Sequence, residues 1–224
     1  MKKIITVTLL AFSLTIFSQE ETTLSKVKFG AKTGLNISSA SVDLNTSGWG
    51  ADESYSTKSY TGFHLGFFAE YAINDKMKLQ PELLYSRQGY KLNFKDDYIN
   101  DTNTYKLNYL VAPLMFKYNI IDNLYAEAGL NIALLIGGEN EYKSVYDASG
   151  TEYDSSETIT EDLPDNFSNL DLGMNIGASY QYNKFLFGLR YTLGLTNLNS
   201  FDGTDDLKSD KSRNFAISVG YFFM

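Results

Sequence analysis

The chain has 224 residues, of which 43% are hydrophobic and 15% aromatic, with 17 glycines, three prolines and no cysteine. This content is too apolar for a disordered chain and suits one ordinary domain or one β-barrel, while the lack of cysteine excludes disulfides, thiolate metal sites and a cysteine nucleophile. The formal charge of -8 argues against nucleic acid as a partner, because nucleic-acid binding needs clustered lysine and arginine.

The first 18 residues have the features of a secretory signal peptide. Two lysines precede an apolar run over residues 4–17, and a small residue, Ser18, stands at its end. The run is short for a membrane-spanning helix, which needs about 20 residues; a buried N-terminal helix is the alternative. We therefore predict a signal peptide over 1–18, a short N-terminal segment over 19–26 and a single domain over 27–224.

Within that domain, apolar and polar residues alternate with a period of two, which is typical of strands with two unlike faces. Each alternating segment is near the 9–11 residues that a tilted strand needs to cross a bilayer. The eight segments are residues 27–37, 61–71, 77–86, 105–118, 124–136, 170–182, 185–195 and 214–223.

The fourth segment changes phase along its length. Its apolar face comprises Tyr105, Leu107, Tyr109, Leu114, Phe116 and Tyr118. Odd-numbered positions give way to even-numbered ones near Pro113, and a β-bulge at that point would tolerate a residue without an amide proton. We therefore predict a bulge at Pro113.

The connections between the segments alternate between short and long. The short, turn-rich ones are residues 73–75, 120–123 and 183–184, and the long, polar ones are residues 38–59, 93–104, 137–169 and 197–213. Short turns at one end and long loops at the other are typical of outer-membrane barrels.

Alternation alone leaves open which face points outward, because a soluble barrel could line a hydrophobic-ligand cavity with its apolar face. Three features favour a membrane barrel. Glycines concentrate on the polar face, where the narrow interior of an eight-stranded barrel needs small residues. Aromatic residues lie near strand ends on the apolar face, as in interfacial girdles; they include Tyr71, Tyr118, Tyr182, Phe185, Tyr191 and Tyr221.

The third feature is the last strand, which ends in aromatic residues followed by Met224 in place of a terminal phenylalanine. Tyr221 and Phe223 resemble the terminal signal that barrel-assembly machinery recognises during biogenesis. We therefore predict an all-β, eight-stranded, antiparallel, up-and-down transmembrane β-barrel in the cell outer membrane, with short periplasmic turns and long extracellular loops.

A resemblance to a known family rests on the signal peptide, the eight strands and two segments, Tyr109–Tyr118 and Val219–Phe223. Together they resemble the PorT-family outer-membrane β-barrel domain, which is similar in architecture to the small OmpA- and OmpX-type barrels. Some members of that family are implicated in protein secretion through the outer membrane, so the resemblance implies a secretion role as one option.

The polar face carries charges that would point into the barrel, where isolated ions are costly and must pair. They are Lys32, His64, Glu70, Glu82, Lys117, Glu127, Asp171 and Arg190. We expect a salt-bridged, plugged lumen in which Arg190 pairs with one or two of Glu70, Glu82 and Glu127; a gated ion path is the alternative.

Little in the sequence indicates a reaction. His64 is the only histidine, no serine or aspartate motif accompanies it, and a metal site is poorly supported. We expect no catalytic, metal or cofactor-binding residue; a His64-dependent lipid-modifying enzyme is the least favoured hypothesis. The leading hypothesis is a structural or interaction role through acidic loops. Outer-membrane lipid would surround the barrel, and a surface or secretion partner would bind at residues 137–169. A small-solute channel or a hydrophobic-ligand barrel is the alternative.

Overall fold

The computed structural model describes residues 27–44, 54–95, 99–146, 156–163, 167–198 and 207–223; the predicted signal peptide and residues 19–26 lie outside these ranges. All the regular elements in the described part are strands. They are β1 (Val27–Leu44), β2 (Ser54–Ala72), β3 (Met77–Lys95), β4 (Ile99–Val111), β5 (Leu114–Ile121), β6 (Leu124–Tyr146), β7 (Ser156–Asp162), β8 (Leu170–Tyr182), β9 (Phe185–Asn197) and β10 (Leu207–Phe222). No helix among the described residues is long and apolar enough to cross a membrane.

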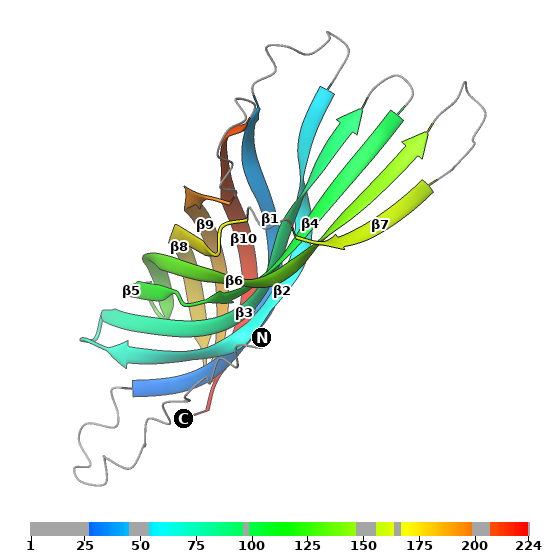
Figure 1. Ribbon diagram of the computed structural model, residues 1–224. Coiled ribbons are helices and arrows are strands. Elements are labelled where there is room, and N and C mark those ends of the chain that lie inside the picture. The colour runs from blue at the N-terminus through cyan, green and yellow to red at the C-terminus, as the bar shows by residue number, and fades with distance from the viewer. Residues whose placement is uncertain are drawn as a thin grey trace, which may run out of the picture.

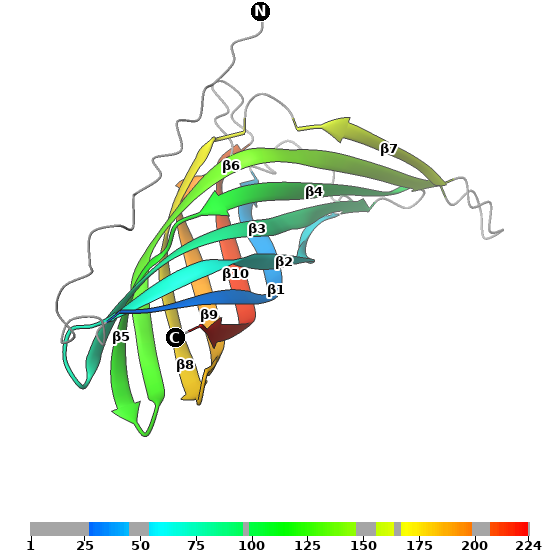
Figure 2. The same cartoon turned by 90° about the horizontal axis from the view of Figure 1, so that it is seen from below.

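The strands close into an antiparallel ring (Figures 1 and 2). Around the ring, β1 pairs with β2, β2 with β3, β6 with β8, β8 with β9 and β9 with β10, and β1 closes the ring by pairing with β10 from Gly30↔Phe222 onward. β4 and β5 both lie between β3 and β6, so they are two pieces of one barrel strand, and the ring has the eight positions that the sequence predicts. Closure pairs backbone groups that would otherwise be unsatisfied in lipid.

The apolar face of the barrel points outward. Phe63, Leu172 and Phe187 on three different strands are 40%, 37% and 49% exposed, whereas Lys117 and Gln80 on the opposite face are 0% exposed. An interior that buries lysine and glutamine while phenylalanine faces out is the reverse of a soluble barrel. The apolar face that carries Phe63, Leu172 and Phe187 therefore does not line the interior.

Aromatic side chains mark the end of the barrel that carries the short turns. Those that are exposed there are Phe29, Tyr71, Tyr118, Tyr182, Phe185, Tyr221 and Phe223. Phe63 and Phe215 are exposed near the middle of β2 and β10. An aromatic belt at one end of the apolar face is typical of a barrel end that meets a bilayer surface.

The short connections use residues suited to tight turns. Asp122, Asn123 and Asn183 adopt positive φ angles of 27°, 67° and 53°, a region that Asn and Asp tolerate better than other side chains. In the remaining short turn, the Asn74 side chain accepts hydrogen bonds from the amides of Lys76 (3.0 Å) and Met77 (2.8 Å).

The predicted bulge at Pro113 is wrong. Tyr85 pairs with Leu110 and Pro81 with Leu114, so the register across from Pro113 is unbroken. Pro113 interrupts only the hydrogen-bonded ladder, because it has no amide proton to donate. The register shift lies instead on β6, where one extra residue separates the partners of β4.

The apparent change of phase has another cause. Odd-numbered residues face inward without a break from β4 to β5, and the buried ones are Leu107, Tyr109, Val111, Pro113, Met115 and Lys117. Above the apolar zone the barrel's outside is polar and its inside apolar, so the chemistry of the two faces exchanges while the strand continues. The prediction of a slip assumed that each face of the strand has the same surroundings along its whole length, and this assumption does not hold.

The long loops are also shorter than predicted, because polar residues extend the strands. β1 continues to Leu44 and β6 to Tyr146, and β7 forms within residues 137–169. Backbone pairing between adjacent strands does not depend on apolar side chains, so hairpins persist beyond the membrane. The ends of β2, β3, β4 and β6, together with β7, form a sheet that projects from the ring (Figures 1 and 2).

Candidate functional site

The candidate site is the interior of the barrel, and Glu82 on β3 is its best-connected group. Its carboxylate accepts two hydrogen bonds from Arg190 on β9, at 2.9 and 2.8 Å, in a bidentate arrangement. Lys32 on β1 lies 3.2 Å from both carboxylate oxygens, and Gln80 donates at 2.7 Å. The Glu82 side chain is 0% exposed, so all of its stabilisation comes from these protein partners.

Two further glutamates extend the network across the lumen. Glu70 on β2 pairs with Lys117 on β5 at 3.0 Å and with Lys78 on β3 at 2.8 Å. Glu127 on β6 lies 3.6 Å from Lys117 and 3.4 Å from Arg190, which joins the two halves. The ions cross-link six separate strands and leave each buried charge near an opposite one.

Of the three glutamates among which one or two partners of Arg190 were expected, Glu82 and Glu127 pair with it, whereas Glu70 pairs with lysines. Sequence reasoning left out Lys78, Gln80 and Tyr125 from the network. Lys78 and Gln80 share the alternation phase of Glu82, so the signal was present; Tyr125, whose ring lies 4.4 Å from the Lys78 ammonium, could not be assigned without the cross-barrel geometry.

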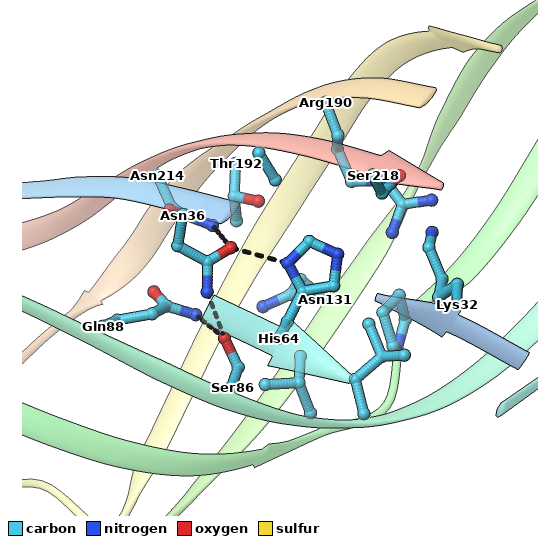
Figure 3. Close-up of a pocket in the computed structure, with 14 residues that line it drawn as sticks. Lys32, Asn36, His64, Ser86, Gln88, Asn131, Arg190, Thr192, Asn214 and Ser218 are labelled. Carbon is cyan, nitrogen blue, oxygen red and sulfur yellow. Dashed lines mark hydrogen bonds between the residues drawn. The ribbon is translucent and has the colours of Figure 1, made fainter. Parts of the chain in front are cut away.

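His64 lies in a separate cluster of neutral groups (Figure 3). Its Nδ1 donates to the side-chain oxygen of Asn36 at 2.9 Å, and the Asn36 amide donates to Ser86 Oγ at 2.9 Å. Gly34 makes room for the ring, since a Cβ at that position would lie 2.6 Å from it. His64 is thus oriented by an amide, not by the carboxylate or hydroxyl partner that catalysis on an ester would use.

Asp171 is also separate from the ion network. It accepts hydrogen bonds from Ser212 at 2.6 Å and Thr196 at 3.0 Å, which link β8 to β9 and β10. Of the eight predicted lumen residues, six therefore form one network, and His64 and Asp171 lie in clusters of their own.

Apolar clusters flank the polar part of the lumen, a feature that the sequence did not predict. Toward the short turns, Phe68, Leu186 and Phe222 pack together, with the two phenyl rings edge to face at 5.0 Å. The cluster toward the long loops is larger: Ala40, Leu84, Tyr90, Leu107, Tyr109, Val111, Ala133, Phe167 and Leu198. From the short turns toward the long loops, the lumen is therefore filled by an apolar layer, a charged layer and a second apolar layer.

Within the described part of the barrel, the cavity beside His64 is small. A cavity of about 40 Å³ borders Lys32, Asn36, His64, Arg190 and Asn214. This volume suits a few water molecules rather than a solute or an acyl chain. Within the described ranges, no three His, Asp or Glu side chains gather closely enough to hold a metal ion.

Comparison with known proteins agrees with this geometry. The model of the outer membrane protein beta-barrel domain family matches residues 17–200. Among curated proteins, none matches this chain.

Three solved structures are similar in fold. The Neisserial surface protein A shares 18% identity, with 86% of this chain and 96% of that chain covered, at a TM-score of 0.46. Ail of Yersinia pestis shares 16% identity, with 88% and 99% covered, at 0.44, and OprG of Pseudomonas aeruginosa shares 16%, with 88% and 96% covered, at 0.41. On its family match, its closed ring and its outward apolar face, this chain belongs to the outer membrane protein beta-barrel domain family and is a protein of the outer membrane.

Proposed function

We propose that this chain is a non-conducting, non-enzymatic anchor that displays its projecting sheet to an extracellular partner. The observation that carries the proposal is the contrast between a filled lumen and strands that continue past the apolar zone. Three layers of packed side chains support a barrel without a solute path. The sheet end of such a barrel is where the long loops of an outer-membrane protein face the outside.

The exposed edge of that sheet supports a partner with a basic, extended segment. Among the described strands, β7 pairs with β6 and with no other, so its second edge is open to another strand. Glu161 and Asp162 on β7 are exposed carboxylates. Backbone pairing would supply the affinity, and these charges would favour lysine and arginine in the added strand.

The filled lumen predicts no conductance. The full-length barrel reconstituted in planar bilayers should give traces without discrete steps at any applied voltage, because on this proposal the apolar clusters and the charged layer block a continuous water column. Single-channel recording is the measurement, with protein-free bilayers as the control. Reproducible steps in the wild type would contradict the sealed-lumen part of the proposal.

The acidic edge predicts selective binding of a basic strand-forming peptide. A peptide of alternating lysine and threonine should bind the reconstituted barrel with its lysines on one face, beside either Glu161 or Asp162. The variant Glu161→Gln/Asp162→Asn should bind it about two- to fivefold more weakly, as expected for the exposed charge pair on that face. Fluorescence anisotropy measures both affinities. The matched control is Asp75→Asn/Asp122→Asn, which removes the same charge at the short turns and should bind like the wild type.

A peptide of alternating glutamate and threonine should not bind. Equal affinity for the two peptides, or equal losses in both variants, would contradict the proposed edge.

The link to secretion that the PorT resemblance implies belongs to the same proposal, with the projecting sheet as the docking surface. A deletion strain that secretes its proteins normally would contradict this link and leave the anchor role standing.

A further inference from the structure

Basic side chains gather on the outer face of β2, β3 and β4, directly above the apolar zone. The last apolar row there pairs Tyr85 with Leu110, and the next row outward pairs Arg87 with Asn108. One row further, Gly89 pairs with Lys106, and in the row beyond that Lys91 pairs with Thr104 on β4 and with Lys58 on β2. The outer face thus changes within one row from apolar to basic.

The depth of this change matches a lipid head group. A strand rises about 3.3 Å per residue, so Arg87 lies about 7 Å beyond Tyr85 along β3. The polar layer on each side of a bilayer is about 5–8 Å thick. Arg87 therefore lies at head-group depth. The rows of Lys106 and Lys91 lie about 13 and 20 Å beyond Tyr85 along the strand, or about 10 and 15 Å along the membrane normal for strands tilted by about 40°. Their backbone is thus outside the head-group layer, and their long side chains have to extend back toward it.

The protein neutralises this cluster only in part. Glu139 on β6 pairs with Arg87 at 2.8 Å and with Lys106 at 3.3 Å, and Glu141 pairs with Lys106 at 2.6 Å. The hydrogen bond to Glu141 raises the pKa of Lys106, so Lys106 stays charged. Two carboxylates therefore face four cations in these three rows of β2–β4 and β6.

Two details indicate room for an external anion. Lys58 and Lys91 lie directly opposite each other, an arrangement of like charges that destabilises a strand pair unless an anion lies between them. The Arg87 side chain is 32% exposed although it pairs with Glu139, so part of it can be reached from outside. Both features favour an acceptor with several oxygen atoms, such as a phosphate.

We propose that the basic rows of β2, β3 and β4, namely Arg87, Lys106, Lys91 and Lys58, bind the phosphate of an outer-leaflet lipid head group. Tyr85 and Leu110, exposed just below, would contact the acyl chains of the same lipid. Arginine grips a phosphate through two donors and lysine adds charge, so the site selects phosphorylated lipid over a neutral one. This is a lipid site on the barrel wall, distinct from the β7 edge.

The test is a titration of the detergent-solubilised, full-length barrel with bisphosphorylated lipid A and with lipid A whose phosphates have been removed. The wild type should bind the phosphorylated form at least about tenfold more tightly, and Arg87→Gln/Lys91→Gln should lose that preference, since each charge-assisted hydrogen bond is worth a tenfold factor or more. The control Lys76→Gln/Lys184→Gln removes the same charge at the short turns and should keep it. Heat-modifiable gel mobility verifies that every variant is folded.

A second variant acts in the opposite direction. Glu139→Gln frees Arg87 and should tighten binding of the phosphorylated lipid, so the proposal can be tested even where the double variant folds poorly. Free inorganic phosphate should not compete at millimolar concentration, because it lacks the acyl chains. Equal binding of both lipids, loss in the control, or full competition by phosphate would overturn the proposal.

Discussion

Replacing Glu82 with glutamine is expected to lower the free energy of unfolding by about 3–5 kcal/mol, the usual cost of removing one partner from a buried ion pair. Glutamine keeps the size of the side chain and removes the charge that faces both Lys32 and Arg190. Those two cations would then repel each other in the lumen, with only Glu127, 3.4 Å from Arg190, left to offset their charge. Urea unfolding of the barrel in lipid vesicles, followed by heat-modifiable gel mobility, measures the change.

The matched control is Glu141→Gln, which also removes one carboxylate from a pair with a lysine. The Glu141 side chain is 35% exposed, so water can replace the lost contact and the cost should be at most about 1 kcal/mol. A loss for Glu82→Gln no larger than for the control would show that the buried network does not hold the barrel together.

Introducing arginine on the outer face should destabilise the barrel according to depth. Ile176 lies in the middle of β8 and is 56% exposed, so Ile176→Arg should cost about 2–4 kcal/mol in a bilayer. Tyr182 lies at the end of the same strand, beside a short turn, and Tyr182→Arg should cost about 0–1 kcal/mol. The cause is the free-energy cost of transferring a cation into hydrocarbon, and this cost falls toward the lipid–water interface.

The measurement is again urea unfolding in vesicles, with both variants made on the same background. In a barrel surrounded by water, arginine at either position would have a small and similar effect. Equal costs at Ile176 and Tyr182 would therefore contradict the position of the bilayer that the exposed apolar side chains indicate.

The alternation of residues was sufficient to predict the barrel wall. A period of two specifies strands, and the turn residues around Asn74, Asp122 and Asn183 specify where hairpins reverse, because both are local properties of the chain. The number of barrel strands and the inward direction of Glu82 and Lys117 followed from the same pattern. These features depend only on near neighbours in sequence.

The pattern failed where the surroundings change along a strand. The apolar residues Tyr105, Leu107 and Tyr109 were expected on the lipid-facing side, yet they pack inside the barrel above the membrane. The extension of β6 to Tyr146 and the existence of β7 were missed for a related reason, since polar hairpins are stabilised by pairing rather than by an apolar face. Environment along the membrane normal is not encoded in a two-residue period.

By itself, the sequence determined that strands would form, which face of each would be apolar, and which charges would share the interior. Only the tertiary structure decided their partners, because the contacts of Glu82 with Arg190 and of Glu70 with Lys117 join residues 108 and 47 positions apart. Such pairs depend on the register of every strand between them and on the curvature of the closed ring. Closure also created the apolar layers at both ends of the lumen and placed Arg87, Lys91 and Lys58 on one face, which no local pattern specifies.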